Sequence, residues 1–547
     1  MPNPQVIAIG LDAAEAELLE PWMSDGSLPN LETIRRKGHY SRLKGIDYFV
    51  AESPWTSFIT GCLPQKTGYW GTVAYDPARY RARELAAYDF KEFPPFYALG
   101  PEFRVCSFDV PHSIPYPGVH GTQIIAWGAH SPLAPSASLP EALYAELVKK
   151  HGKHPALNKD FGVWWDKTHL HFLRKALSTG IERRAEISSD LLRREHWDLF
   201  LTVFSETHSA GHDLWFLSRP DHPLYGLREG FGFKDDPLLA IYKKIDGAVG
   251  RILRSADPNA AVVVFSTHGM NSNSNDLPSM LFLGEMLYRY SLPGESMYKR
   301  GVFDGSKLGT TQRSMRRGWT GDIWRRRDQG GILRTALIRS LPMGPLKILD
   351  RLFQTPAEQS FAIPFRQLGS LAWQPVTWYE PHWPRMRAFA LPSYSEGYVR
   401  LNVQGRDARG LIPENNYGHE CETISRMILG WRCARTKAPI ARKVIRMRKH
   451  ANENGSKAPD ADLVVLWQLH AADAVEHPDY GRIGPMPYNR TGSHSDRGFI
   501  LACGPGVRSG PPSEEGRSID LAPTLLRLMG AKLPPYLDGK PLAFTTP

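Results

Sequence analysis

Long hydrophobic runs are missing from this chain of 547 residues. No segment approaches the roughly 18 to 20 consecutive apolar residues that a membrane span requires. The opening residues, MPNPQVIAIGLD, contain no basic stretch, no apolar signal core and no small-residue cleavage site. We therefore expect a cytoplasmic protein that has no membrane association.

Cysteine is scarce, and its spacing excludes paired-cysteine chemistry. The cysteines are Cys62, Cys106, Cys421, Cys433 and Cys503, an odd number that contains no CxxC pair. This pattern predicts free thiols that serve as buried packing residues in a reducing compartment. Zinc-finger, homeodomain and RNP-type signatures are also missing, so we do not expect a nucleic acid partner.

The net charge indicates the kind of partner, and the chain length indicates the domain organisation. Lys and Arg number 67 against 56 Asp and Glu, which gives a formal net charge of +11. Such an excess predicts an anionic partner, either a small-molecule substrate or an acidic carrier protein. The length exceeds what one compact core usually holds, so a large domain with an insertion or second lobe is expected. No pattern in the sequence indicates the oligomeric state.

Short apolar runs alternate with helix-like stretches such as 168–192. The runs cover residues 6–11, 198–205, 260–266 and 463–467. This alternation predicts an α/β protein with a mostly parallel sheet. Ligands of such sheets lie beyond the carboxyl ends of the strands.

Metal-capable side chains follow three of these runs. Asp12 comes after the first, His208 and His212 after the second, and His268 after the third. A single histidine is more often a surface residue or a satisfied core residue. Their shared placement at strand ends instead predicts one common site.

The composition changes between residues 275 and 395, where Arg, Trp and Pro are frequent. We predict a core formed by residues 1–274 and 396–547, with residues 275–395 as an inserted basic cap. The arginines that stand out are Arg316, Arg317, Arg325, Arg326 and Arg327. They form either a solvated face or a binding surface for an anionic substrate or carrier.

Several motifs together resemble one family, and they span nearly the whole chain. They are IAIGLDAAE, LPNLETIRRKG, SPWTSFITGCLPQKTG (53–68), FSTHGM (265–270), GYVRLNVQGRDARG (397–410), TGSHSDRGFILACGPGV (491–507) and SIDLAPTLLRLMGAKLPPYLDGKPL (518–542). The chain resembles the type I phosphodiesterase/nucleotide pyrophosphatase branch of the alkaline phosphatase superfamily. The resemblance implies an alkaline-phosphatase-like α/β sandwich with an inserted cap.

The resemblance also implies a metal site. Members hold two metals, commonly zinc, about a Thr or Ser nucleophile. One metal takes the aspartate after the first strand, the nucleophile and an Asp-His pair. The other takes an Asp and a His four residues apart and a late histidine. The positions retained here are Asp12, His212, His268 and His494.

The departures from that pattern change the expected chemistry. The nucleophile position falls on Ala51, which excludes covalent catalysis there. The two missing aspartates are replaced by His208 and Thr267, and the histidine of the PxxHG turn by Thr67. The loss of two carboxylates should weaken the second metal most.

Three imidazoles, those of His208, His212 and His494, can still hold zinc and leave a fourth position open. His208 and His212 could face one ion if their segment is helical. The resemblance thus implies Zn²⁺ as the cofactor, with one ion or two.

Three further residues are candidate catalytic groups. Glu52 and Ser53 neighbour the lost nucleophile position, and a shift of the loop by one residue would present either to the metal. Their alternative role is to cap a helix that begins near Trp55. Glu206 lies two residues from His208 and is a candidate ligand or a partner of an imidazole.

Three functions fit these residues. The first is a metal-dependent hydrolase or transferase for a phosphate, sulfate or related ester that works without a covalent intermediate. The second is an enzyme that uses one metal as a Lewis acid for acyl or carbamoyl transfer in specialised biosynthesis. The third is an inactive scaffold. The retained His212, His268 and His494, and the replacement of one aspartate by His208, itself a good ligand, argue against it.

Overall fold

The computed structural model describes residues 5–51, 53–160, 162–298, 370–453, 457–513 and 516–546, with 303, 319–324, 326, 327 and a few single positions between 299 and 369. The chain forms two compact units. Unit 1 contains Met1–Trp70, Ala86–Asn271 and Thr491–Pro547, and unit 2 contains Gly71–Leu85 and Ser272–Arg490.

An eight-stranded sheet forms the centre of unit 1, in the order β2-β19-β9-β1-β8-β5-β6-β7. Its strands are β1 (Val6–Leu11), β2 (His39–Lys44), β5 (Val105–Phe108), β6 (Gly121–Ile125), β7 (Ala137–Leu139), β8 (Leu199–Phe204), β9 (Ala261–Ser266) and β19 (Arg497–Cys503). The five strands from β9 to β6 are parallel to one another, and the strands that flank them, β19 and β7, are antiparallel to them. The predicted α/β class with a mostly parallel sheet is therefore confirmed.

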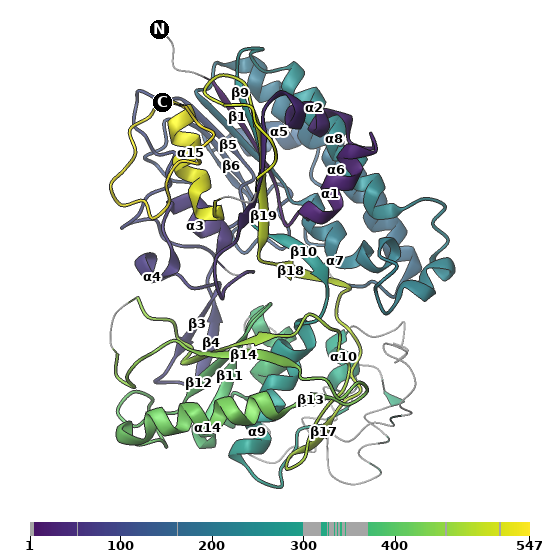
Figure 1. Cartoon of the computed structure of the whole chain (residues 1–547), viewed down its shortest axis with the longest axis vertical. Coiled ribbons are helices and arrows are strands. Elements are labelled where there is room, and N and C mark those ends of the chain that lie inside the picture. Colours follow the sequence, from purple (N-terminus) through teal and green to yellow (C-terminus); the bar gives the residue numbers. More distant parts are fainter. Residues whose placement is uncertain are drawn as a thin grey trace. The chain divides into compact units, whose positions relative to one another are not determined.

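The central strands are apolar because both faces of the sheet are covered by helices. Every residue of β1, β5 and β8 is buried. The helices are α1 (Ala16–Ser24), α2 (Pro29–Lys37), α3 (Pro54–Thr60), α4 (Pro64–Thr67), α5 (Leu143–His151), α6 (Lys167–Arg194), α7 (Glu206–Ser218), α8 (Pro237–Arg254) and α15 (Leu521–Leu528). Figure 1 shows α2, α6 and α8 on one side of the sheet and α3 and α15 on the other.

The chain leaves and re-enters unit 1 at neighbouring strands. β10 (Gly269–Ser272) follows β9 directly and pairs with β18 (Gly492–Ser495), which leads into β19. β19 is antiparallel to both β9 and β2. More than two hundred residues of unit 2 are thus inserted between adjacent strands of unit 1.

Unit 2 is built around an antiparallel sheet in the order β11-β12-β15-β14. Its strands are β3 (Val73–Asp76), β4 (Arg81–Glu84), β11 (Ala388–Leu391), β12 (Gly397–Leu401), β13 (Arg432–Cys433), β14 (Ala441–Arg446), β15 (Leu463–Trp467), β16 (Val475–His477) and β17 (Gly481–Ile483). Its helices include α9 (Leu283–Ser291), α10 (Trp319–Trp324) and α14 (Tyr417–Gly430).

The two units divide the chain differently from the predicted boundaries. Residues 396–490, expected in the core, lie in unit 2 because β12, β15 and β14 follow β11 in one antiparallel sheet and do not join the central sheet. The hairpin of β3 and β4 also belongs to unit 2. The five cysteines are free, as predicted, and all but Cys503 are buried. Among the described residues, no helix is long and apolar enough to cross a membrane.

Candidate functional site

The metal-capable residues gather at the carboxyl edge of the central sheet. Asp12 directly follows β1, which lies between β8 and β9. His208 and His212 lie on the first turns of α7, the helix that begins after β8. His268 lies between β9 and β10, and His494 lies on β18. The parallel register of three adjacent strands therefore brings distant parts of the sequence together.

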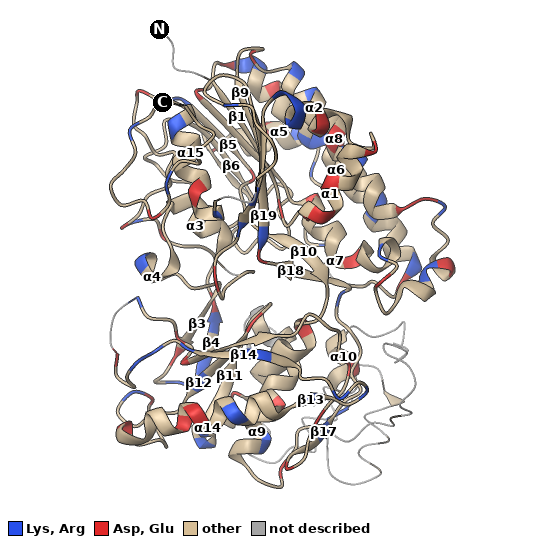
Figure 2. Ribbon diagram, in the orientation of Figure 1, with Lys and Arg blue, Asp and Glu red and all other residues tan. Residues whose placement is uncertain are grey.

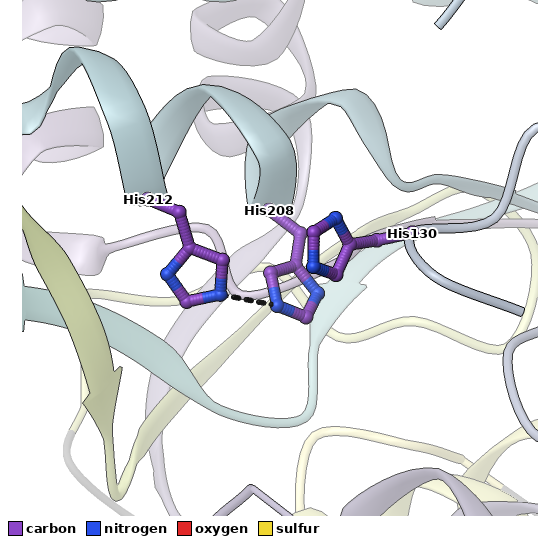
Figure 3. A group of neighbouring side chains, drawn as sticks. All are labelled: His130, His208 and His212. Atoms are coloured by element: carbon purple, nitrogen blue, oxygen red, sulfur yellow. Dashed lines mark hydrogen bonds between the residues drawn. The ribbon is translucent and has the colours of Figure 1, made fainter. Parts of the chain in front are cut away.

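His208 and His212 are one helical turn apart and point toward one another (Figure 3). The Nδ1 atom of His208 lies 2.8 Å from Oδ2 of Asp12, and Nδ1 of His212 lies 2.8 Å from the carbonyl oxygen of Gly492. Because both partners can only accept, each Nδ1 carries a proton. In the neutral form of each ring, the Nε2 atom then keeps its lone pair.

These Nε2 atoms meet at short range. Nε2 of His208 lies 2.9 Å from Nε2 of His212 and 2.9 Å from Nε2 of His494. Lone pairs at this separation repel unless a cation, either a proton or a metal ion, lies between them. The Nδ1 partners match the arrangement that orients histidine ligands in metalloproteins.

Asp12 is buried, and its carboxylate is held on both oxygens. Oδ1 accepts a hydrogen bond from Nε1 of Trp55 at 2.7 Å, and Oδ2 faces His208. Burial by itself raises the pKa of Asp12, but the charge and hydrogen bond of His208, with His268 and Trp55, lower it below its ordinary value. Asp12 is therefore an anion fixed beside the imidazoles.

His268 occupies the buried side of the same cluster. Its Nδ1 atom lies 2.9 Å from Oγ1 of Thr267, and its Nε2 atom lies 3.9 Å from Oδ1 of Asp12. Among the described residues, Nε2 has no hydrogen-bond partner. Burial lowers the pKa of His268 to about 4, despite the opposing charge of Asp12. The ring is neutral at pH 7, and its Nε2 is a candidate ligand atom.

Two further histidines near the cluster were not predicted. His130 follows β6, and its ring centroid lies 4.3 Å from that of His208 and 5.3 Å from that of His212. His112 follows β5; burial lowers its pKa, an effect that the charge of Asp12 opposes. The overlooked signal was an apolar run that ends shortly before a metal-capable residue. Asp12 was predicted from such a run, and His112 and His130 also follow one.

Among the described residues, one group of three histidines has ligand atoms that all lie within 4.8 Å of one another, namely His130, His208 and His212. Figure 3 shows the His130 ring beside that of His208, on a separate segment from α7. The two rings are inclined by only 31°. The His494 ring lies on the other side of the cluster, and its Nε2 atom is 2.9 Å from Nε2 of His208. His130 and His494 are therefore both candidates for the third ligand position beside His208 and His212.

Glu206 belongs to a different group. Its Oε1 atom lies 3.1 Å from Nε of Arg184 and 3.2 Å from Nε2 of His154. A second carboxylate, that of Asp109, lies 2.9 Å from the same guanidinium and accepts hydrogen bonds from the amides of Trp127 and Gly128. Residues two positions apart on a helix face opposite directions, so Glu206 points away from the cluster that contains His208. The expected pairing with His208 or its metal is corrected accordingly.

The loop before α3 places Ser53 away from any described contact with the histidines. Ser53 is buried, and its hydroxyl donates to the carbonyl oxygen of Phe49 at 3.2 Å. It stands at the start of α3 but makes no side-chain capping hydrogen bond. Glu52 lies outside the described residues.

The described arginines of the predicted cap make contacts inside unit 2. Arg326 donates to the carbonyl oxygen of Pro485 at 2.5 Å. Arg327 is buried, with its guanidinium 4.1 Å from the ring centroid of Trp324. Arg316, Arg317 and Arg325 lie outside the described residues. Figure 2 shows Lys and Arg interspersed with Asp and Glu on helices such as α2 and α14.

The chemistry of the donor set fits one transition metal. Imidazole nitrogens suit zinc, copper and nickel, whereas magnesium and calcium prefer oxygen ligands. Two carboxylates among the described residues contact these histidines: Asp12 contacts His208, and Asp160 bonds to His130. Fold and site together define an α/β protein with a histidine-rich, metal-capable site at the carboxyl edge of its sheet.

The chain belongs to the type I phosphodiesterase/nucleotide pyrophosphatase family, whose model matches residues 6–303. No curated protein matches it. It is similar to human ectonucleotide pyrophosphatase/phosphodiesterase 5, with 12% identity and a TM-score of 0.47 over 98% of this chain and 97% of that one. It is also similar to phosphonoacetate hydrolase from Sinorhizobium meliloti 1021 in complex with phosphonoacetate, with 12% identity and a TM-score of 0.46 over 97% and 96%.

Proposed function

We propose that this protein is a zinc-dependent hydrolase of a phosphate, sulfate or related ester in which water replaces the side-chain nucleophile. The observation that carries the proposal is the 2.9 Å contact of the His208 Nε2 atom with Nε2 of both His212 and His494. Membership of a family of phosphodiesterases and pyrophosphatases supports the class of ester.

The ligands would be His208, His212 and His494. Their neutral imidazoles favour zinc over oxygen-preferring ions. When bound, zinc supplies Lewis-acid chemistry, because three protein ligands leave a position at which an oxygen can be polarised. Asp12 orients the His208 ring through Nδ1 and supplies negative charge beside the ion.

A second zinc would have few ligands. His268 and Asp12 approach each other at 3.9 Å, but Thr267 stands where a further carboxylate would be needed. A hydroxyl is a weak zinc ligand compared with an anionic carboxylate. We therefore propose one zinc ion for each chain.

We propose water as the nucleophile because the described residues before α3 offer no side chain in that role. Ala51 offers no nucleophilic group, and the hydroxyl of Ser53 is committed to the carbonyl of Phe49. A single displacement by water then replaces the two-step route through a covalent enzyme intermediate.

Metal analysis and a generic ester test the proposal. The wild-type chain, purified without chelator, should contain about one zinc and hydrolyse bis(4-nitrophenyl) phosphate. His212→Ala should lose at least nine tenths of both, because Nε2 of His212 is a ligand. His171→Ala is the matched control, since that histidine lies on α6 and bonds to the carbonyl of Phe231. A His212→Ala chain that keeps its zinc would overturn the proposal.

The absence of a covalent intermediate has its own test. Intact-mass spectrometry of acid-quenched turnover should show only the unmodified chain. A phosphoryl adduct on Ser53 or Thr56 would contradict single displacement by water while leaving the zinc site standing.

The loss of two family carboxylates favours a second candidate, a Lewis-acid enzyme for acyl or carbamoyl transfer. A chain that contains zinc at the three histidines but leaves phosphate and sulfate esters intact would favour this candidate. A chain that binds no metal would instead favour an inactive scaffold.

A further inference from the structure

His130 is held by a hydrogen-bonded group that the proposed zinc site does not use. Its Nδ1 atom lies 2.6 Å from Oδ2 of Asp160 and 3.1 Å from Oγ of Ser209. The Ser209 hydroxyl donates to the same Asp160 oxygen at 2.5 Å. The His130 side chain remains 15% exposed, whereas that of Asp160 is 4% exposed. The buried carboxylate of Asp160 thus holds the ring of His130 in place, and the ring itself stays partly accessible to solvent.

This anchoring fixes which nitrogen of His130 carries the proton. Asp160 is an anion, because His130 and Ser209 lower its pKa to about 2 although burial opposes this. A carboxylate can only accept, so Nδ1 of His130 donates, and in the neutral imidazole Nε2 is the acceptor. The Nε2 atom makes only a long, 3.5 Å contact with the hydroxyl of Ser131.

The His130 ring also lies beside the proposed zinc ligands, where it could orient an attacking water. Ligand atoms of His130, His208 and His212 all lie within 4.8 Å of one another. The His130 ring lies beside the proposed ligand set, with its centroid 4.3 Å from that of His208. A fixed acceptor in this place can align a lone pair of water with the reacting phosphorus or sulfur.

We propose that His130 is a catalytic residue that positions the attacking water by accepting its hydrogen bond at Nε2, with Asp160 and Ser209 as positioning residues. This inference rests on the proposed function. A site without a side-chain nucleophile needs a group that holds the attacking water in line with the ester. His130 would be that group. Alignment of this kind can change a rate about a hundredfold.

The test uses the full-length, zinc-loaded chain with bis(4-nitrophenyl) phosphate as the probe. His130→Ala should lower kcat about a hundredfold, leave KM within about twofold and retain zinc. His130→Gln, whose amide oxygen can accept a hydrogen bond, should recover part of that loss. Asp160→Asn should lower kcat about tenfold, because the ring is no longer held in one tautomer. His171→Ala again serves as the control.

Each other outcome has a defined meaning. Unchanged kcat in His130→Ala, or a rise in KM alone, overturns the inference and leaves the proposed function standing. Loss of zinc from His130→Ala makes His130 a ligand and also overturns it. Should that variant fail to fold, His130→Gln and Ser209→Ala replace it, with losses of about tenfold and threefold expected. A zinc-loaded wild-type chain that leaves the probe intact overturns the proposed function and this inference with it.

Discussion

Two clusters of histidine and carboxylate share helix α7 but are built for different purposes. Around Glu206, a guanidinium lies between two carboxylates, and Arg184, Asp109 and Glu206 are all fully buried. Around His208, imidazole lone pairs face one another, and the side chain is still 13% exposed. Glu206 and His208 are two residues apart, so the same helix serves both clusters from opposite faces.

The difference lies in how positive charge is supplied. In the Glu206 cluster the cation is part of the chain and is further packed against aromatic rings, with Trp127 5.2 Å from the guanidinium carbon. In the His208 cluster the positive charge would come from a bound ion. The first cluster should therefore control stability, and the second should control metal binding.

The largest expected effect is on stability. Arg184→Leu leaves two buried carboxylates without their cation and should lower the free energy of unfolding by about 3–5 kcal/mol. Urea denaturation measures this, and zinc per folded chain should not change. Arg183→Leu is the matched control, because Arg183 bonds only to the carbonyl of Lys153 at the surface, and a change within about 0.5 kcal/mol is expected. Loss of zinc from Arg184→Leu would mean that the clusters are not independent.

A smaller effect is expected on metal affinity. Asp12→Asn removes the anion that orients His208 and should weaken zinc binding about 10- to 100-fold. Competition with a chromophoric chelator gives the affinity. Glu17→Gln is a control, since the Glu17 carboxylate pairs with Arg497 at an exposed position. Equal affinities for Asp12→Asn and the wild type would remove Asp12 from the site.

The smallest effect concerns the other oxygen of Asp12. Trp55→Phe keeps an aromatic ring against Phe58 and Phe265 but removes the hydrogen bond to Oδ1. Zinc affinity should fall less than tenfold, because the charge of Asp12 and its contact with His208 remain. The same chelator competition applies, and a loss as large as that of Asp12→Asn would contradict this ranking.

Much of the fold could be predicted because the central strands are short apolar runs between helices. The runs at 6–11, 198–205 and 260–266 match β1, β8 and β9, and the helix expected at 168–192 lies within α6. The run at 463–467 is also a strand, but it belongs to the antiparallel sheet of unit 2. Apolar periodicity reveals a strand but not the sheet to which it pairs.

The site could be predicted where residues directly follow strands. Asp12, His208, His212 and His268 come together because parallel strands end at one edge. His494, which the family resemblance implied, joins them from β18. Glu206 is the partner of an imidazole, that of His154 and not that of its neighbour His208, because closeness in sequence does not give the face of a helix. His130 and Asp160 were missed because their pairing joins two loops separated by 30 residues, and no local pattern records it.

The pairing of β10 with β18 also sets the order in which the molecule can be completed during synthesis. β19 fills the gap between β9 and β2, yet the ribosome must add Ser272–Arg490 of unit 2 after β9 before β19 emerges. At about 5 to 20 residues per second, this delay is roughly 10 to 50 s. His494 emerges with the same late segment, so a nascent chain has both an open sheet edge and an incomplete ligand set. Early release of the chain would therefore yield a protein that can neither close its sheet nor complete the proposed metal site.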